Sequence, residues 1–184
     1  GVAPAKFAHI PLILNNDGSK MSKRDMGASM ETYMDGGYLP SAVINYLSLL
    51  GWSPKDDTEV MPVAELIERF DLSGVQRANA RFDMVKLDWQ NYEHIRALPA
   101  EEFKNQALGQ LKSANIDTSS CEESYIDAAV ATCADKIKNL NDFSAYIGFY
   151  FQQEVLFDPE AAEKALTPEN KPYLTALREA FSAL

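Results

Sequence analysis

Apolar residues recur every three or four positions along most of this chain, which is the spacing of one face of an α-helix. The pattern predicts helices at residues 30–35, 40–50, 62–70, 84–98, 99–111, 121–138 and 141–151, and two more that begin at Pro159 and Pro168. The fold class predicted from the pattern is therefore mainly α.

Residues typical of helix starts support these boundaries. Ser29 and Asp83 stand directly before predicted helices, where their side chains can accept hydrogen bonds from backbone N–H groups. Pro40, Pro62 and Pro99 stand at or near first turns, where a missing N–H costs little. We expect Pro99 also to mark a domain boundary.

Two groups of apolar residues are interpreted as core. Aromatic rings recur between Phe143 and Phe151 at helical spacing with few cations among them, so we expect core packing rather than a base-stacking platform. The buried face expected for the helix at 84–98 consists of Val85, Leu87, Trp89, Tyr92 and Ile95.

The N-terminal segment departs from the helical pattern. Residues 9–14 form a short apolar run with β-branched members, which predicts a strand with Pro11 at its start or at a sheet edge. The Asn, Asp, Gly and Ser residues at 15–19 favour a tight turn. A basic loop, Lys-Met-Ser-Lys-Arg, follows directly at 20–24.

This loop gathers cations that suit a phosphate group. Lys20 and Lys23 carry compact ammonium charges on flexible stems, which can follow a phosphoryl group as its charge moves. Arg24 adds a planar fork of donors. The alternative is a solvated basic turn without a ligand.

Charge argues against an extensive nucleic-acid interface but leaves room for a local one. The net charge is −10, and residues 1–100 hold ten Lys and Arg against thirteen Asp and Glu. Residues 101–184 are more acidic, with seven against fourteen. A local basic surface around the connection at 71–81 is predicted to bind nucleic acid. Its residues are Arg69, Arg77, Arg81 and Lys86.

Other classes of protein find little support. No apolar run approaches the roughly 20 residues of a membrane-spanning helix, and the first residues lack the apolar core of a signal peptide. Cys121 and Cys133 are expected to pack in a reducing compartment, with no second Cys or His at metal-ligand spacing from either. His9 and His94 stand alone in the sequence, so we expect a structural role for each rather than a role as metal ligand or base. We expect a cytoplasmic protein with no membrane partner and no metal site in this chain.

The segment from Pro11 to Arg24 resembles the second signature motif of class I aminoacyl-tRNA synthetases, in the form found in bacterial glutamyl-tRNA synthetases. Residues 37–53 and 82–91 are similar to segments that follow this motif in that family, and residues 138–143 more weakly. The likeness covers residues 7–155. It implies that residues 1–28 end the catalytic nucleotide-binding domain as a short β/loop remnant.

The resemblance also implies a helical stem-contact domain at 29–98 and an incomplete, bundle-like α-helical anticodon-binding domain at 99–184. The family's His-Ile-Gly-His element and its glutamate and adenosine pockets would lie upstream. We therefore expect a piece of a longer enzyme, inactive alone, whose parent works as a monomer.

The reaction implied is activation of glutamate by ATP with Mg²⁺, followed by transfer to the tRNA for glutamate. Lys20 and Lys23 would be catalytic, with Lys23 on the triphosphate, while Lys20 and Arg24 add positive potential. The Met21 main chain would approach adenosine, and Ser22 would supply a small polar position. ATP and glutamate would be held through the upstream domain.

Three alternative classes of protein share some of these features. A non-catalytic helical module for tRNA or protein binding would make no use of Lys20 and Lys23. Glutaminyl-tRNA synthetases share the loop, but their anticodon region is built of β-barrels, which the helical pattern opposes. A truncated glutamyl-queuosine synthetase would lack a long helical anticodon domain.

Overall fold

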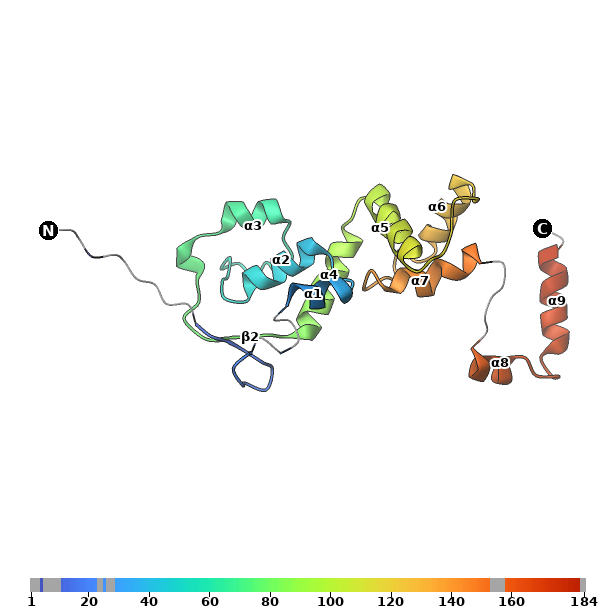
Figure 1. The fold of residues 1–184 in the computed structure, drawn as a ribbon, viewed down its shortest axis with the longest axis horizontal. Helices are drawn as coiled ribbons and strands as arrows, with labels where there is room; N and C mark the ends of the chain where they lie inside the picture. Colours follow the sequence, from blue (N-terminus) through green and yellow to red (C-terminus); the bar gives the residue numbers. More distant parts are fainter. Residues whose placement is uncertain (1–3, 5–10, 23–24, 26–28, 153–157, 183–184) are drawn as a thin grey trace. The chain divides into compact units, whose positions relative to one another are not determined.

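The protein is described from a computed structural model, which describes residues 4, 11–22, 25, 29–152 and 158–182 (Figure 1). The chain divides into two compact units, Gly1–Phe151 and Gln152–Leu184. Both are built from helices, so the mainly α prediction is confirmed. The boundaries expected at residues 28 and 98 stay predictions, and both fall inside the first unit.

Helices occupy most of the described part of the first unit. They are α1 (Met30–Asp35), α2 (Pro40–Leu49), α3 (Val63–Arg69), α4 (Met84–Arg96), α5 (Ala100–Ser113), α6 (Glu123–Ala131) and α7 (Asp142–Ile147), with short 3-10 turns η1 (Leu72–Gly74) and η2 (Gly148–Phe151). The expected caps are present, since Asp83 accepts hydrogen bonds from the N–H groups of Val85 and Lys86, and Ser29 accepts one from Glu31.

The helix predicted at 121–138 is shorter than expected. After Ala131 the backbone N–H groups of Thr132 and Cys133 bond to carbonyls three residues back, and the chain continues in turns. The Thr132 hydroxyl also donates to the Ala129 carbonyl at 2.7 Å. A side chain that occupies a nearby carbonyl competes with the next helical hydrogen bond.

A two-stranded parallel sheet ties the N-terminal segment to the helices. Strand β1 (Ile13–Leu14) pairs with β2 (Ala80–Arg81), with Ile13 opposite Ala80 and Leu14 opposite Arg81. Of the strand predicted at 9–14, residues 9 and 10 lie outside the described residues. Strand β2 was not predicted, because a two-residue pairing leaves almost no pattern in sequence.

Three apolar clusters form the core of the first unit. The largest joins Leu39 and Ala42 of the N-terminal half to Phe103, Leu111 and Phe143 of the later helices. A second is built from Tyr33, Val43, Tyr46, Phe82 and Leu87, and a third from Trp52, Met61 and Leu66. In Figure 1, α2 lies against α4, as their packing contacts also show.

The buried face of α4 differs from the predicted one. Leu87 and Ile95 are buried, but Val85 is 77% exposed and Trp89 is 41% exposed. Polar residues take their place, namely Gln90, Asn91 and His94. Asn91 explains why, since its amide accepts a hydrogen bond from the Leu39 N–H at 2.9 Å and donates one to the Lys138 carbonyl at 3.0 Å. Helix α4 therefore packs partly against loop backbone, whose polar groups need partners.

The aromatic residues near α7 are only partly in the core. Phe143 is fully buried with its ring centroid 5.0 Å from that of Phe103, as expected. Tyr146 and Phe149 are each 44% exposed, so the prediction of core packing is wrong for these two rings. Helix α7 ends at Ile147 and the chain continues in the 3-10 turn η2, so the α-helical spacing on which the prediction rested does not extend to Phe149.

His94 predicts a pH dependence of stability. Its Nε2 lies 2.9 Å from Oδ1 of Asn45, which also accepts the Met61 N–H, and burial lowers the pKa of His94 below its ordinary 6.5. The folded chain therefore binds fewer protons at His94 than the unfolded chain does. At a pH well above 6.5 His94 leaves the free energy of unfolding unaffected, and as the pH drops through 6.5 this free energy falls.

Urea unfolding of this chain at about pH 8 and about pH 5.5 measures the effect. A fall at the lower pH is expected, and His94→Gln should reduce it, because an amide nitrogen can replace Nε2 without titrating. An equal fall in both proteins would assign the dependence to other groups.

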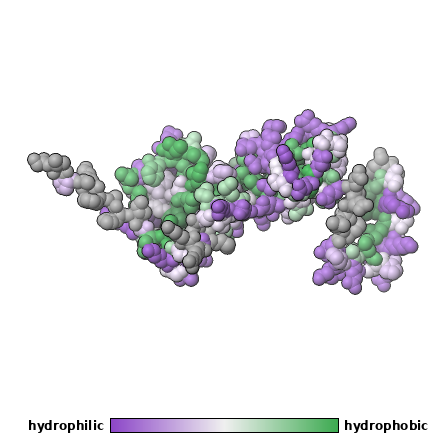
Figure 2. All heavy atoms as spheres, in the orientation of Figure 1, coloured by the Kyte–Doolittle hydropathy of each residue, from purple (hydrophilic) through white to green (hydrophobic). Residues whose placement is uncertain are grey.

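The second unit contains α8 (Pro159–Ala165) and α9 (Lys171–Ser182). Asp158 caps α8 by accepting from the Ala161 N–H at 2.8 Å. Leu174, Leu177 and Phe181 of α9 are exposed, and Figure 2 shows apolar surface on this unit among polar residues. Within the described ranges of both units, no helix is long and apolar enough to cross a membrane.

Candidate functional site

The turn before the basic loop is closed by its own hydrogen bonds. The Asn15 N–H donates to the Ser19 carbonyl at 2.8 Å, and the Gly18 N–H donates to the Asn15 carbonyl at 2.9 Å. Gly18 has φ +86°, a left-handed conformation that glycine adopts without strain. The Asp17 carboxylate accepts the Ser19 N–H at 2.8 Å. The turn predicted at 15–19 is therefore present.

The chain leaves this turn as an extension of the small sheet. Lys20 forms an antiparallel bridge with Leu14, and the Met21 N–H donates to the Ile13 carbonyl at 3.1 Å. The Met21 side chain packs against the cluster that contains Tyr33. Lys20 is exposed. The packed side chain of Met21 therefore anchors the start of the loop, and the preceding Lys20 stays at the surface.

Asp25 holds the loop from its far end. Its Oδ2 accepts hydrogen bonds from the Ser22 N–H at 2.6 Å and from the Asn15 side-chain amide at 3.0 Å. These bonds, the one from Ser22 first, lower the pKa of Asp25. Asp25 was not among the predicted site residues, although an Asp three residues after Ser22 in a polar segment was a usable signal. Lys23 and Arg24 lie outside the described residues.

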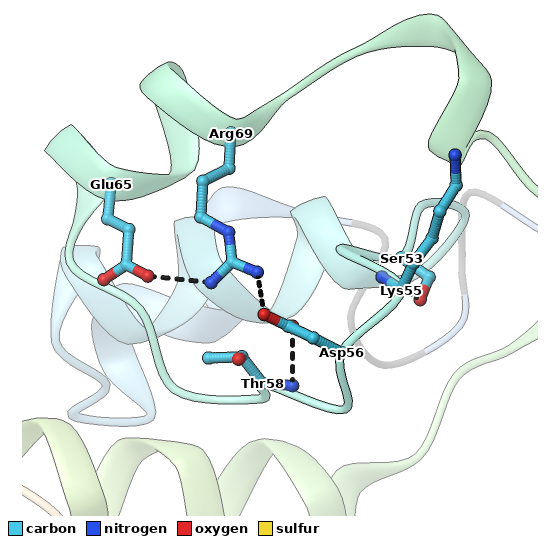
Figure 3. A network of polar contacts seen from close by, with 6 residues as sticks. All are labelled: Ser53, Lys55, Asp56, Thr58, Glu65 and Arg69. Carbon is cyan, nitrogen blue, oxygen red and sulfur yellow. Dashed lines mark hydrogen bonds and ion pairs between the residues drawn. The ribbon is translucent and has the colours of Figure 1, made fainter.

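Arg69, predicted to contact nucleic acid, is engaged within the protein. Figure 3 shows its guanidinium between the Glu65 and Asp56 carboxylates. The Glu65 oxygen lies 2.9 Å from Nη1. Asp56 also accepts the Thr58 N–H at 3.2 Å. Hydrogen bonding from Thr58 and then from Arg69 lowers the pKa of Asp56, so this carboxylate stays charged and keeps Arg69 paired.

The other three cations of the predicted basic surface have different surroundings. Lys86 forms an ion pair with Glu59. Lys86 and Arg81 line one hollow of about 250 Å³, together with Gln76 and Asn79. Arg77 is exposed, and it directly follows Gln76 in the chain. The structure therefore brings Arg81 and Lys86 together, pairs Arg69 elsewhere, and leaves nucleic-acid binding by all four as a prediction.

Two family models match consecutive parts of the chain. Residues 1–89 match the catalytic domain of class I tRNA synthetases (E and Q), and residues 93–184 match an anticodon-binding domain. A curated protein of Akkermansia muciniphila, a glutamate–tRNA ligase, is 49% identical over 164 residues. The chain belongs to the glutamyl-tRNA synthetase family. The resemblance found in the sequence is thereby confirmed.

Other members of the glutamyl-tRNA synthetase family match the whole chain. The glutamate–tRNA ligase of Methylacidiphilum infernorum is 39% identical and covers 100% of this chain. A crystal structure of a glutamate tRNA ligase from Elizabethkingia meningosepticum has a TM-score of 0.80 and 30% identity over 98% of this chain. The Akkermansia match covers 89% of this chain. The chain spans 36% of the Akkermansia relative, 41% of the Methylacidiphilum relative and 39% of the crystallised chain.

The side chains of Asn139 and Asn141, here called the asparagine clasp, join the part of the chain that matches the catalytic domain to the part that matches the anticodon-binding domain. The Asn139 amide donates to the Gly36 carbonyl, and the Asn141 amide donates to the Asp35 carbonyl at 2.9 Å. The Leu140 N–H donates to the Gly37 carbonyl at 2.9 Å. The connection between α1 and α2 is therefore held by the segment before α7. Single Asn residues in a polar loop carry no sequence pattern that reveals such a contact.

Proposed function

We propose that the protein containing this chain is a glutamate–tRNA ligase, which activates glutamate with ATP and transfers it to the tRNA for glutamate. The observation that carries the proposal is the match of a class I catalytic region and an anticodon-binding region, in that order, within one chain. The anchored basic loop adds chemical support, because it presents Lys20 at the surface beside a structured turn.

Within this proposal the loop binds the phosphates of ATP. Lys20 and Lys23 are the residues assigned to the triphosphate, with Arg24 adding positive potential. Met21 holds the loop through its packed side chain while its main chain approaches the adenosine, and Ser22 keeps the loop narrow. Mg²⁺ enters with ATP, which lowers the charge that the loop has to neutralise.

The helical regions are assigned to the tRNA. The anticodon-binding region at 93–184 supplies one contact surface. The exposed cation Arg77, which precedes β2, supplies another. Since ATP and tRNA are substrates, we place the enzyme in the cytoplasm, where both are available.

Glutamate-dependent exchange of pyrophosphate into ATP tests the function. The full-length protein, with its tRNA, is expected to catalyse exchange and to charge the tRNA for glutamate. The 184-residue chain is expected to do neither, because a phosphate loop without the rest of its pocket binds ATP weakly. Absence of exchange and charging by the full-length protein would favour a non-catalytic helical module. Exchange by the 184-residue chain would contradict the proposal that the rest of the ATP and glutamate pocket lies in other parts of the full-length protein.

A further inference from the structure

Arg81 lies next to the phosphate loop, although the sequence grouped it with the cations of the interhelical connection. The carbonyls of Leu12 and Leu14 accept hydrogen bonds from the Ala80 and Phe82 N–H groups on one edge of β1. The Ile13 carbonyl accepts from Met21 on the opposite edge. The loop, β1 and β2 therefore lie side by side as three extended segments.

This pairing places two cations on one face. Leu14 is opposite Arg81 on one edge and opposite Lys20 on the other. Side chains of directly paired residues leave a sheet on the same face. Lys20 and Arg81 therefore project from the same face, separated by two strand spacings, or about 10 Å at their Cα atoms.

The Arg81 guanidinium is held weakly. Its Nη1 lies 3.5 Å from the Asn16 carbonyl oxygen, which is the outer limit for a hydrogen bond. Its Nη2 lies beside Gly18, 3.8 Å from the point that a Cβ would occupy if this glycine were an alanine. Arg81 is exposed and forms no ion pair with any described residue. Arg69 and Lys86, in contrast, each pair with carboxylates.

Asp17 in the turn and Asp25 after the loop form hydrogen bonds with neighbouring residues, and neither forms an ion pair with Arg81 in the described part of the chain. Asp17 accepts the Ser19 N–H at 2.8 Å, and Asp25 accepts from Ser22 and Asn15. Both acidic side chains are thus committed to the backbone and side chains of the loop itself. The guanidinium at the edge of the turn keeps its planar fork available for an anion.

We propose that Arg81 binds the polyphosphate of ATP together with Lys20. This inference rests on the proposed function. A guanidinium can bind two phosphate oxygens at once, and charge-assisted pairs of this kind are stronger than neutral hydrogen bonds. Parallel pairing with β1 brings this donor to the turn from a segment more than fifty residues later in the chain.

Arg81→Gln in the full-length protein tests the proposal. In glutamate-dependent pyrophosphate exchange, kcat/KM for ATP is expected to fall about tenfold, with KM for tRNA unchanged in the charging reaction. Arg81→Lys should recover part of the loss, because it keeps the charge without the fork. Lys55→Gln is the matched control, since it removes another exposed cation, one that donates to the Ser73 hydroxyl and lies outside the regions assigned to ATP and tRNA, and it should leave both parameters unchanged.

The outcomes separate this inference from the proposed function. If wild-type protein shows no exchange or charging, the function itself fails. If wild type is active and Arg81→Gln has normal kinetics for ATP, the inference is overturned. A raised KM for tRNA with normal ATP kinetics would also overturn it, and would assign Arg81 to the tRNA surface. Equal melting temperatures of wild type and variant establish that a kinetic loss is local.

Discussion

Lys23→Ala in the full-length protein should lower the rate of adenylate formation by about a hundredfold. The reason is that the Lys23 charge is proposed to be engaged most strongly as the triphosphate is attacked, and an interaction that strengthens in the transition state appears in the rate. Losing one such contact typically costs about 3 kcal/mol of activation free energy. Single-turnover formation of the adenylate measures the rate, and glutamate binding should change little.

Two further variants sharpen the Lys23 prediction. Lys23→Arg should not restore the full rate, because a planar fork does not follow moving phosphates as a compact ammonium does. Lys112→Ala removes a lysine from the last turn of α5 and should leave the rate unchanged. Near wild-type rates for Lys23→Ala would instead support a solvated basic turn that takes no part in the reaction.

Gly37→Ala is expected to destabilise the first unit by about 3 kcal/mol. Gly37 has φ +72°, where an alanine is strained. A Cβ there would lie 2.2 Å from the Asn139 side-chain oxygen and 2.9 Å from the Asn141 backbone nitrogen. Both neighbours belong to the asparagine clasp, so a shift that admits the methyl group breaks its hydrogen bonds. Urea unfolding of the chain measures the loss.

Gly109→Ala is the matched control for this substitution. Gly109 lies inside α5, and a Cβ there would meet nothing within 4 Å. Alanine is the better helix former, so this variant should be more stable than wild type by about 0.5 to 1 kcal/mol. A Gly37→Ala protein that unfolds at the same urea concentration as wild type would show that the clasp yields without cost.

Local signals were enough to predict much of the helical fold. Asp83 and Ser29 cap their helices as expected, because a cap depends on residues within one turn of each other. The turn at 15–19 follows from the same kind of local preference. The family resemblance also came from contiguous segments, and the matched family models confirm it. The roles of Lys20 and Lys23 stay predictions.

Other features were decided by contacts between distant segments. Periodicity predicted that Val85 and Trp89 of α4 face the core, but the amides of Gln90 and Asn91 are buried there because loop carbonyls and N–H groups require partners. The helix predicted to reach residue 138 ends at Ala131, where side-chain and backbone groups compete for the same carbonyls.

The surroundings of the candidate site show the same division. The sequence by itself determined that a strand, a polar turn and a basic loop follow one another, since each depends on neighbouring residues. Only the tertiary structure decided which cations lie near that loop, because Arg81 reaches it through a strand pairing across more than sixty residues, while Arg69 is drawn to Asp56 and Glu65. Attraction between opposite charges depends on their distance in the folded protein and not on their separation in sequence. Cations that are neighbours in sequence can therefore have different partners.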